Sequence, residues 1–165
     1  MQNISDADLQ QLTTQVAKIL LKRNWRLASA ESCTGGWLAK CCTDIAGSSA
    51  WFDRGVVTYS NLSKQELLHV QADTLEQFGA VSEQVALEMA KGCQSQSVAD
   101  LSVSITGVAG PDGGSKAKPV GTVWLAWASS SSAKAELHHF SGNREAVRRQ
   151  AVYTALNGII KNASD

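Results

Sequence analysis

Strand-like and helix-like segments alternate along this chain, and the alternation restricts the folds that it can adopt. Segments rich in small and β-branched residues are typical of strands, whereas apolar residues spaced three and four apart are typical of one face of a helix. The predicted strands cover residues 27–31, 55–60, 101–106, 120–128 and 135–140. The predicted helices cover residues 5–23, 37–42, 61–70, 82–93 and 143–161.

Strands that are separated by helices are expected to run parallel, because the chain crosses back over the sheet between them. The last two predicted strands are separated only by the serine-rich turn 129–132 and should form an antiparallel hairpin. The order of elements therefore predicts an α/β fold, a three-layer α/β/α sandwich whose mixed sheet is mostly parallel. With 165 residues the chain has the size of one domain, and we assign residues 1–165 to it.

The composition excludes several classes of protein. Hydrophobic residues make up 44% of the chain and charged residues 18%, which suffices for a core and excludes a disordered chain. Fifteen Lys and Arg balance fifteen Asp and Glu, so no excess positive charge favours nucleic acid or an anionic membrane. No apolar run approaches the roughly 18 residues of a membrane span. We expect neither nucleic acid nor membrane as a partner.

The cysteines indicate a reducing compartment. Their spacing fits neither a zinc site nor a disulfide framework, and the polar start of the chain does not resemble a signal peptide. The four are Cys33, Cys41, Cys42 and Cys93. We therefore expect a cytoplasmic protein that uses no metal and no cofactor.

Ligands of an open α/β sheet bind beyond the carboxyl ends of its strands, where turns enter helices. The segments expected there are residues 31–36, 59–64, 106–114 and the start of the last helix. They contain Ser32, Tyr59 and Lys64. A lysine can accept a serine proton only where its environment keeps it neutral, and the dipole of the helix beginning at Asn61 would act in that direction. Backbone N–H groups after Ser32 could stabilise an oxyanion.

The same residues have ordinary structural interpretations. Serines before glycines commonly cap helices, and lysines on short helices are commonly solvated. Cys33 is an alternative nucleophile, since a thiol at a helix N-terminus has a lowered pKa, although packing is the commoner role of a cysteine. Ser48 or Ser49 could be a nucleophile, a cap or a substrate contact. The glycine-rich loop 107–121 matches neither nucleotide-binding fingerprint, so ATP and dinucleotides are not predicted.

Six segments, in one order, resemble the C-terminal domain family of the competence/damage-inducible protein CinA. They are AESCTGG (30–36), GSS (47–49), GVVTYSN (55–61), GAVS (79–82), SITGVAGPDGG (104–114) and PVGTVW (119–124). The resemblance extends over about residues 5–160. More narrowly, the chain resembles members that consist of this domain alone and hydrolyse nicotinamide mononucleotide (NMN). It implies a mixed five-stranded sheet between helices, and conversion of NMN and water to nicotinate mononucleotide and ammonia without a metal.

The resemblance also implies the roles of individual residues. Ser32 would be the nucleophile, Lys64 the general base and Tyr59 an auxiliary hydroxyl. The implied substrate contacts are Cys33, Thr34, Gly35, Gly36, Ser48, Thr106, Gly107, Gly110 and Arg148, the last on the phosphate. Larger CinA proteins have a further N-terminal domain, and the resemblance does not imply the chemistry of that domain for this chain.

Two other functions stay open at this point. One is a pyridine-nucleotide-binding or regulatory module without catalysis, and the other is an amidohydrolase for a different pyridine, such as free nicotinamide. Five tryptophans, expected to be partly exposed, leave room for a homo-oligomer.

Overall fold

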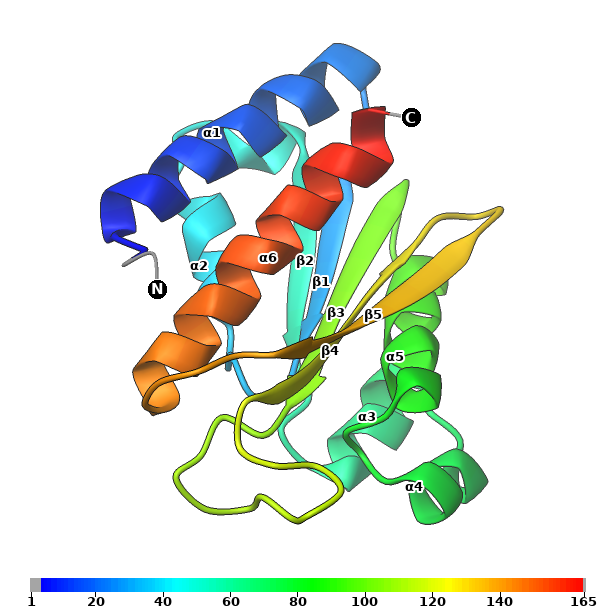
Figure 1. Cartoon of the computed structure of the whole chain (residues 1–165). Helices are drawn as coiled ribbons and strands as arrows, with labels where there is room; N and C mark the ends of the chain where they lie inside the picture. The colour runs from blue at the N-terminus through cyan, green and yellow to red at the C-terminus, as the bar shows by residue number, and fades with distance from the viewer. Residues whose placement is uncertain (1–3, 165) are drawn as a thin grey trace.

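The computed structural model describes residues 4–164, and a single five-stranded sheet lies at its centre (Figure 1). The strands are β1 (Leu27–Glu31), β2 (Phe52–Val57), β3 (Leu101–Gly107), β4 (Thr122–Ala128) and β5 (Ala133–His139). Their order in the sheet is β2-β1-β3-β4-β5. β1 pairs in parallel with β2 and β3, whereas β4 runs antiparallel to both β3 and β5. The predicted mixed sheet is confirmed, but half of its strand pairs are antiparallel, because β4 lies between two strands that it opposes.

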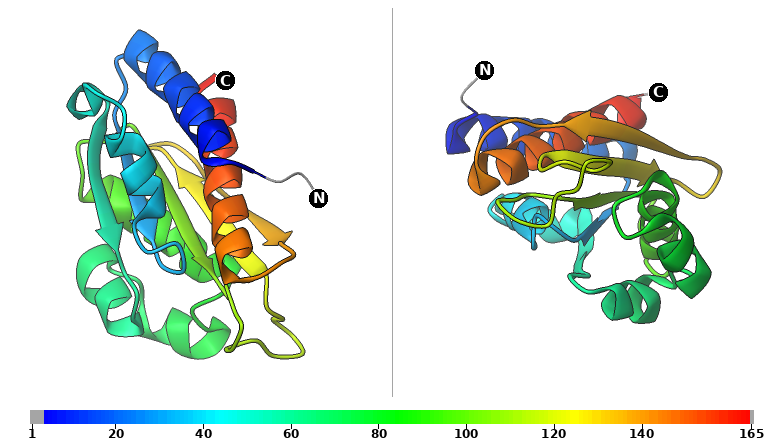
Figure 2. Two further views of the ribbon diagram at one scale, coloured as in Figure 1. Left: turned by 90° about the vertical axis from the view of Figure 1, so that its left-hand side faces the viewer. Right: turned by 60° about the horizontal axis from the view of Figure 1, so that its bottom comes forward.

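Helices cover both faces of this sheet (Figures 1 and 2). One face carries α1 (Asp6–Arg23), α2 (Trp37–Thr43) and α6 (Arg144–Ser164). The other carries α3 (Asn61–Leu68), α4 (Ala72–Phe78) and α5 (Glu83–Ser95). The predicted three-layer α/β/α sandwich is therefore confirmed.

A local signal explains where α3 begins. The Ser60 side chain accepts a hydrogen bond from the Ser63 backbone N–H at 3.1 Å, and Ser63 Oγ accepts one from the Ser60 N–H, which is a reciprocal N-terminal cap. Since β2 ends at Val57, the helix starts directly beyond the carboxyl end of that strand. This cap places Lys64 in the first turn of α3, next to the edge of the sheet.

Packing on the α5 side relies on small and hydroxyl-bearing residues. Ser102 and Ser104 of β3 donate hydrogen bonds to the α5 carbonyls of Ala90 and Ala86, at 2.7 and 2.6 Å. These buried hydroxyls are thus satisfied by the helix that covers them. The contact holds α5 close to the strand whose end leads into the glycine-rich loop.

Two short elements were not predicted. The helix α4 buries only Leu75, so it has no apolar periodicity that the sequence could reveal. The 3-10 helix Ser48–Ala50 has no buried residue at all. In addition, β2 begins at Phe52 rather than at Gly55 and ends before the predicted limit.

The tryptophans are less exposed than expected. Trp51 and Trp127 are fully buried, and the other three are half-buried. The tryptophans therefore give no support to the homo-oligomer that the sequence analysis left open. Among residues 4–164, no helix combines the length and the apolar character needed to cross a membrane.

Candidate active site

The turn after β1 and the first turn of α3 bring Ser32 and Lys64 together. The Ser32 N–H donates to the Ile105 carbonyl of β3 at 2.9 Å, which ties the turn to the neighbouring strand. Lys64 Nζ lies 3.0 Å from Ser32 Oγ and donates to the Thr58 carbonyl at 2.8 Å. The two residues that the sequence analysis paired are therefore in hydrogen-bond contact.

The environment of Lys64 favours its neutral form. The residue is only 1% exposed, and within residues 4–164 no carboxylate lies at ion-pair distance from its amine. Because burial disfavours the charged form, it lowers the pKa of Lys64 from the ordinary 10.5. Burial therefore acts in the same direction as the effect expected from the helix dipole. A neutral Nζ has a lone pair that can accept the Ser32 proton over the same contact.

The buried carboxylate of Glu31 shapes the turn that carries Ser32, and the sequence analysis gave it no role. Its oxygens accept hydrogen bonds from Thr34 Oγ1 at 2.7 Å and from the N–H groups of Gly36, Leu38 and Ala39 at 3.1, 3.1 and 2.8 Å. Glu31 thereby satisfies donors that the start of α2 would leave free. An acidic residue just before a turn into a helix was the available signal.

Two of the backbone N–H groups expected to face an oxyanion are already engaged. The Gly35 N–H donates to the Ser32 carbonyl at 3.0 Å, and the Gly36 N–H donates to Glu31. Gly35 and Gly36 have φ values of 60° and 94°, a left-handed backbone that glycine adopts without strain. Within the described part of the chain, the N–H groups of Cys33 and Thr34 donate to no backbone or side-chain oxygen. These two remain as donors.

Cys33 lies beside the serine but has the properties of a packed thiol. It is 7% exposed, and burial raises its pKa to about 11. This direction is opposite to the lowering considered for a helix N-terminus. The thiolate, which is the nucleophilic form, is therefore scarce near neutral pH.

A pocket of about 320 Å³ opens beside the Ser32–Lys64 pair. Its walls come from the turn after β1, the start of α3, the turn before α5, the end of β3 with the loop after it, and the first residue of α6. The predicted site residues that line it are Ser32, Cys33, Tyr59, Lys64, Thr106, Gly107 and Gly110. We call it the serine pocket.

Tyr59 is linked to an arginine rather than to the lysine. Its side chain is 62% exposed, and its hydroxyl accepts a hydrogen bond from Arg144 Nη2 at 2.8 Å. Arg144 Nη1 also donates to the Gly110 carbonyl at 2.7 Å. Arg144 therefore bridges two walls of the serine pocket, a position that the sequence analysis did not assign to it.

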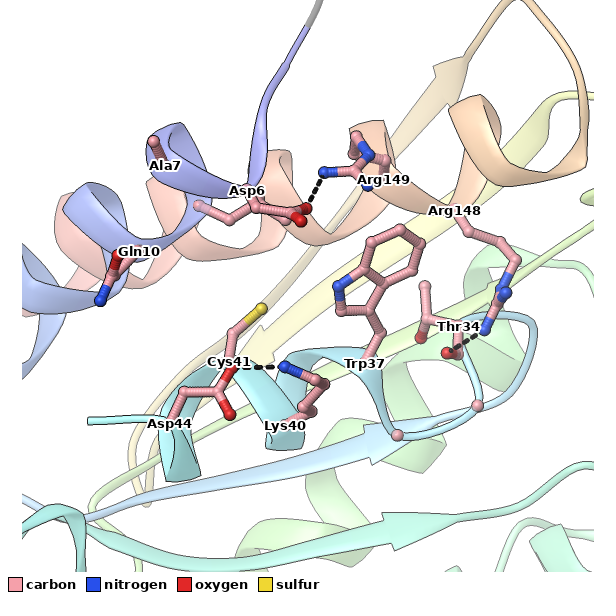
Figure 3. Close-up of a pocket in the computed structure, with 13 residues that line it drawn as sticks. Asp6, Ala7, Gln10, Thr34, Trp37, Lys40, Cys41, Asp44, Arg148 and Arg149 are labelled. Atoms are coloured by element: carbon pink, nitrogen blue, oxygen red, sulfur yellow. Dashed lines mark hydrogen bonds and ion pairs between the residues drawn. The ribbon is translucent and has the colours of Figure 1, made fainter. Parts of the chain in front are cut away.

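Five predicted substrate contacts lie outside the serine pocket. Thr34, Gly35, Gly36 and Arg148 line a second cavity of about 900 Å³ on the other side of the nucleophile turn (Figure 3). Ser48 precedes β2, so it lies at the amino ends of the parallel strands, whereas Ser32 follows the carboxyl end of β1. The structure thus separates the side chains of Ser48 and Arg148 from the Ser32–Lys64 pair, whereas Thr34, Gly35 and Gly36 belong to the turn that carries Ser32.

Residues 4–164 contain no group of three or more His, Cys, Asp or Glu side chains placed to hold a metal ion. What the site does offer is an alcohol, a buried amine, two free backbone donors and a cationic bridge. The first three are the kinds of group that acyl transfer to a serine uses.

This combination defines an α/β protein with a serine–lysine pair at the ligand-binding edge of its sheet. The sequence model of the CinA C-terminal domain matches residues 9–163, so the chain belongs to that family. The chain is 54% identical to a curated protein of Enterobacter agglomerans named nicotinamide-nucleotide amidohydrolase PncC, over 96% of this chain and 100% of that protein. An Escherichia coli K12 protein of the same name is also 54% identical, over 93% of each chain.

Solved structures of the family have the same fold. A CinA superfamily protein from Klebsiella pneumoniae superposes with a TM-score of 0.91 at 42% identity, over 94% of this chain and 98% of that one. A competence/damage-inducible protein from Agrobacterium tumefaciens gives 0.94 at 39% identity, over 99% of both chains.

Proposed function

We propose that this chain is a nicotinamide-nucleotide amidohydrolase that converts NMN and water to nicotinate mononucleotide and ammonia. The observation that supports it most is the buried Lys64 amine, 3.0 Å from Ser32 Oγ and without a carboxylate partner in the described residues. The names of the relatives supply the substrate, and the site supplies groups suited to cleaving an amide.

The first half of the reaction acylates the serine. Ser32 Oγ attacks the carboxamide carbon while Lys64 Nζ takes the hydroxyl proton. The carbonyl oxygen becomes an oxyanion, which the N–H groups of Cys33 and Thr34 stabilise. When the C–N bond breaks, the Lys64 ammonium returns its proton to the departing nitrogen, so ammonia leaves and an ester remains on Ser32.

The second half releases the acid. A water molecule attacks the ester carbon and gives a proton to the neutral Lys64. The C–O bond to Ser32 then breaks, and the serine recovers its proton from Lys64. The positive pyridinium ring of the substrate makes the carbonyl more electrophilic and disfavours a charged lysine next to it, so substrate and base act in the same direction.

We assign the phosphate of the substrate to Arg144 rather than to Arg148. Arg144 lines the serine pocket, whereas the Arg148 guanidinium is bonded to carbonyls on the other side of the nucleophile turn. A guanidinium is suited to bind phosphate oxygens in pairs. Tyr59, which accepts a hydrogen bond from Arg144, would hold that guanidinium in place.

An ammonia-release assay tests the proposal. The purified protein should release ammonia from NMN, and mass spectrometry should identify nicotinate mononucleotide as the product. Free nicotinamide and nicotinamide riboside should be poorer substrates, because they lack the phosphate. Thermal stabilisation by NMN without any ammonia would instead support a binding or regulatory module.

A further inference from the structure

The second cavity brings cationic groups against the side of the nucleophile turn that faces away from the serine pocket. Figure 3 shows Trp37 of α2 beside Arg148 and Arg149 of α6, with Asp6 of α1 joined to Arg149. The guanidinium carbons of Arg148 and Arg149 lie 5.3 and 4.9 Å from the centre of the Trp37 ring. Both arginines therefore have an aromatic neighbour that restricts their side chains.

The two arginines differ in what they bind. Arg148 Nε donates to the Cys33 carbonyl at 3.0 Å, and its Nη2 donates to the Thr34 carbonyl at 2.9 Å. Arg149 instead forms ion pairs with Asp6 and Glu145. Only Arg148 holds the backbone that immediately follows Ser32.

A peptide unit is planar and trans, so its C=O and N–H point in opposite directions. A donor that fixes the Cys33 carbonyl therefore fixes the Thr34 N–H, which points away from Arg148 and from the second cavity. The next peptide is held at both ends, because Arg148 binds the Thr34 carbonyl and the Gly35 N–H donates to Ser32. Of these two N–H groups, the Gly35 donor is engaged and the Thr34 donor is left for a ligand.

We propose that Arg148 is a positioning residue, which orients the Thr34 N–H toward the oxyanion by gripping the Cys33–Thr34–Gly35 backbone from the second cavity. The inference rests on the proposed amidohydrolase function and goes beyond it. Arg148 contacts no reacting atom. Its role is to hold the Thr34 N–H in the orientation that stabilises the oxyanion before the negative charge develops there.

The test compares Arg148→Gln with its matched control Arg149→Gln, which stands in the same cavity beside the same tryptophan. Initial rates are measured with NMN and with nicotinamide riboside, which lacks the phosphate. Arg148→Gln should lower kcat by about 10- to 100-fold for both substrates, with KM nearly unchanged, because one oxyanion donor loses its orientation. Arg149→Gln should leave kcat within about twofold of the parent protein.

The substitution Arg148→Lys keeps the positive charge but removes the planar guanidinium that binds the two carbonyls. Arg148→Lys should therefore have a kcat between those of Arg148→Gln and the parent protein. It also provides the test of Arg148 if Arg148→Gln does not fold. The acid limb of the pH profile should keep its midpoint, because Lys64 is untouched.

Each of the following results would overturn the inference. If Arg148→Gln raises KM for NMN alone and leaves kcat intact, Arg148 binds the phosphate. An unchanged kcat, or an equal loss in Arg149→Gln, would also refute positioning. A parent protein that releases no ammonia from NMN would remove the proposed function and this inference with it, whereas an active parent with an active Arg148→Gln removes the inference alone.

Discussion

The serine pocket and the second cavity share one turn of chain, yet their lysines differ in burial and in their partners. In the second cavity, the exposed Lys40 is paired with Asp44 and the less exposed Arg149 with Asp6, while Arg148 binds two backbone carbonyls. In the smaller serine pocket, Lys64 is buried and has no carboxylate within ion-pair distance among the described residues. The comparison teaches that a buried amine without a carboxylate partner, next to a hydroxyl, indicates the reactive site better than the size of a cavity does.

The largest expected effect separates Ser32 from its neighbour Cys33. Ser32→Ala and Lys64→Ala should each lower kcat for ammonia release by about 10³-fold or more, because each removes the nucleophile or its base. Cys33→Ala is the matched control on the same turn and should retain most of its turnover. If Cys33→Ala were inactive while Ser32→Ala kept its activity, the nucleophile would be misassigned.

The pH profile tests the charge state of Lys64 directly in turnover. Burial lowers the Lys64 pKa, so the neutral base should be present at pH values below 10.5 and should be lost as the pH falls through the lowered pKa. Below that point kcat/KM should fall by about tenfold per pH unit. Rates measured from pH 5 to 10 check this, and a flat acid side would exclude lysine as the base.

Arg144 and Arg148 provide a contrast between the two sides of the turn. Arg144→Gln should raise KM for NMN by about tenfold, because the phosphate loses its charged partner in the serine pocket. Turnover of nicotinamide riboside should change little. An equal loss with both substrates would mean that Arg144 acts on the reacting group or on the fold and does not bind the phosphate.

Glu31 should matter more for stability than for substrate affinity. Glu31→Ala would leave several buried donors without a partner and should lower the free energy of unfolding by about 2 kcal/mol or more. Glu31→Gln keeps one oxygen acceptor and should lose less. Urea denaturation of both variants measures the difference, and equal stability of all three proteins would show that the carboxylate does not hold the turn.

The smallest effect is expected at the rim of the second cavity. The side chains of Lys40 and Asp44 are both largely exposed and pair with each other, and neither residue lines the serine pocket. Asp44→Asn should therefore leave kcat within about twofold of the parent. A clear loss of turnover would mean that this rim takes part in the reaction.

Much of the arrangement could be predicted from local sequence patterns. Apolar periodicity located α1, α5 and α6, and the turns after two strands indicated that Ser32, Tyr59 and Lys64 lie at the same edge of the sheet. These predictions worked because parallel strands end on one side of a sheet, so each strand-to-helix turn is placed by its strand.

The rest depends on contacts between segments far apart in sequence. The burial of Lys64 depends on how α3 packs against α5 and on contacts of its amine with Ser32 and Thr58, and the carbonyls that Arg148 binds are more than a hundred residues away from it. The spacing of residues along the chain does not reveal which side of the Ser32 turn an arginine of α6 contacts. That is why Arg148 was expected at the phosphate and Arg144 was not.

The charge on Lys64 tests the account most directly. Lysines labelled with ¹³C at Cε can be titrated by NMR, and the Lys64→Ala variant identifies the Lys64 signal by its absence. We predict that this signal titrates clearly below 10.5, and that the midpoint in the free protein matches the acid limb of kcat/KM. A Lys64 signal that titrates at or above 10.5, in a protein that hydrolyses NMN at neutral pH, would contradict the proposal that a neutral lysine activates Ser32.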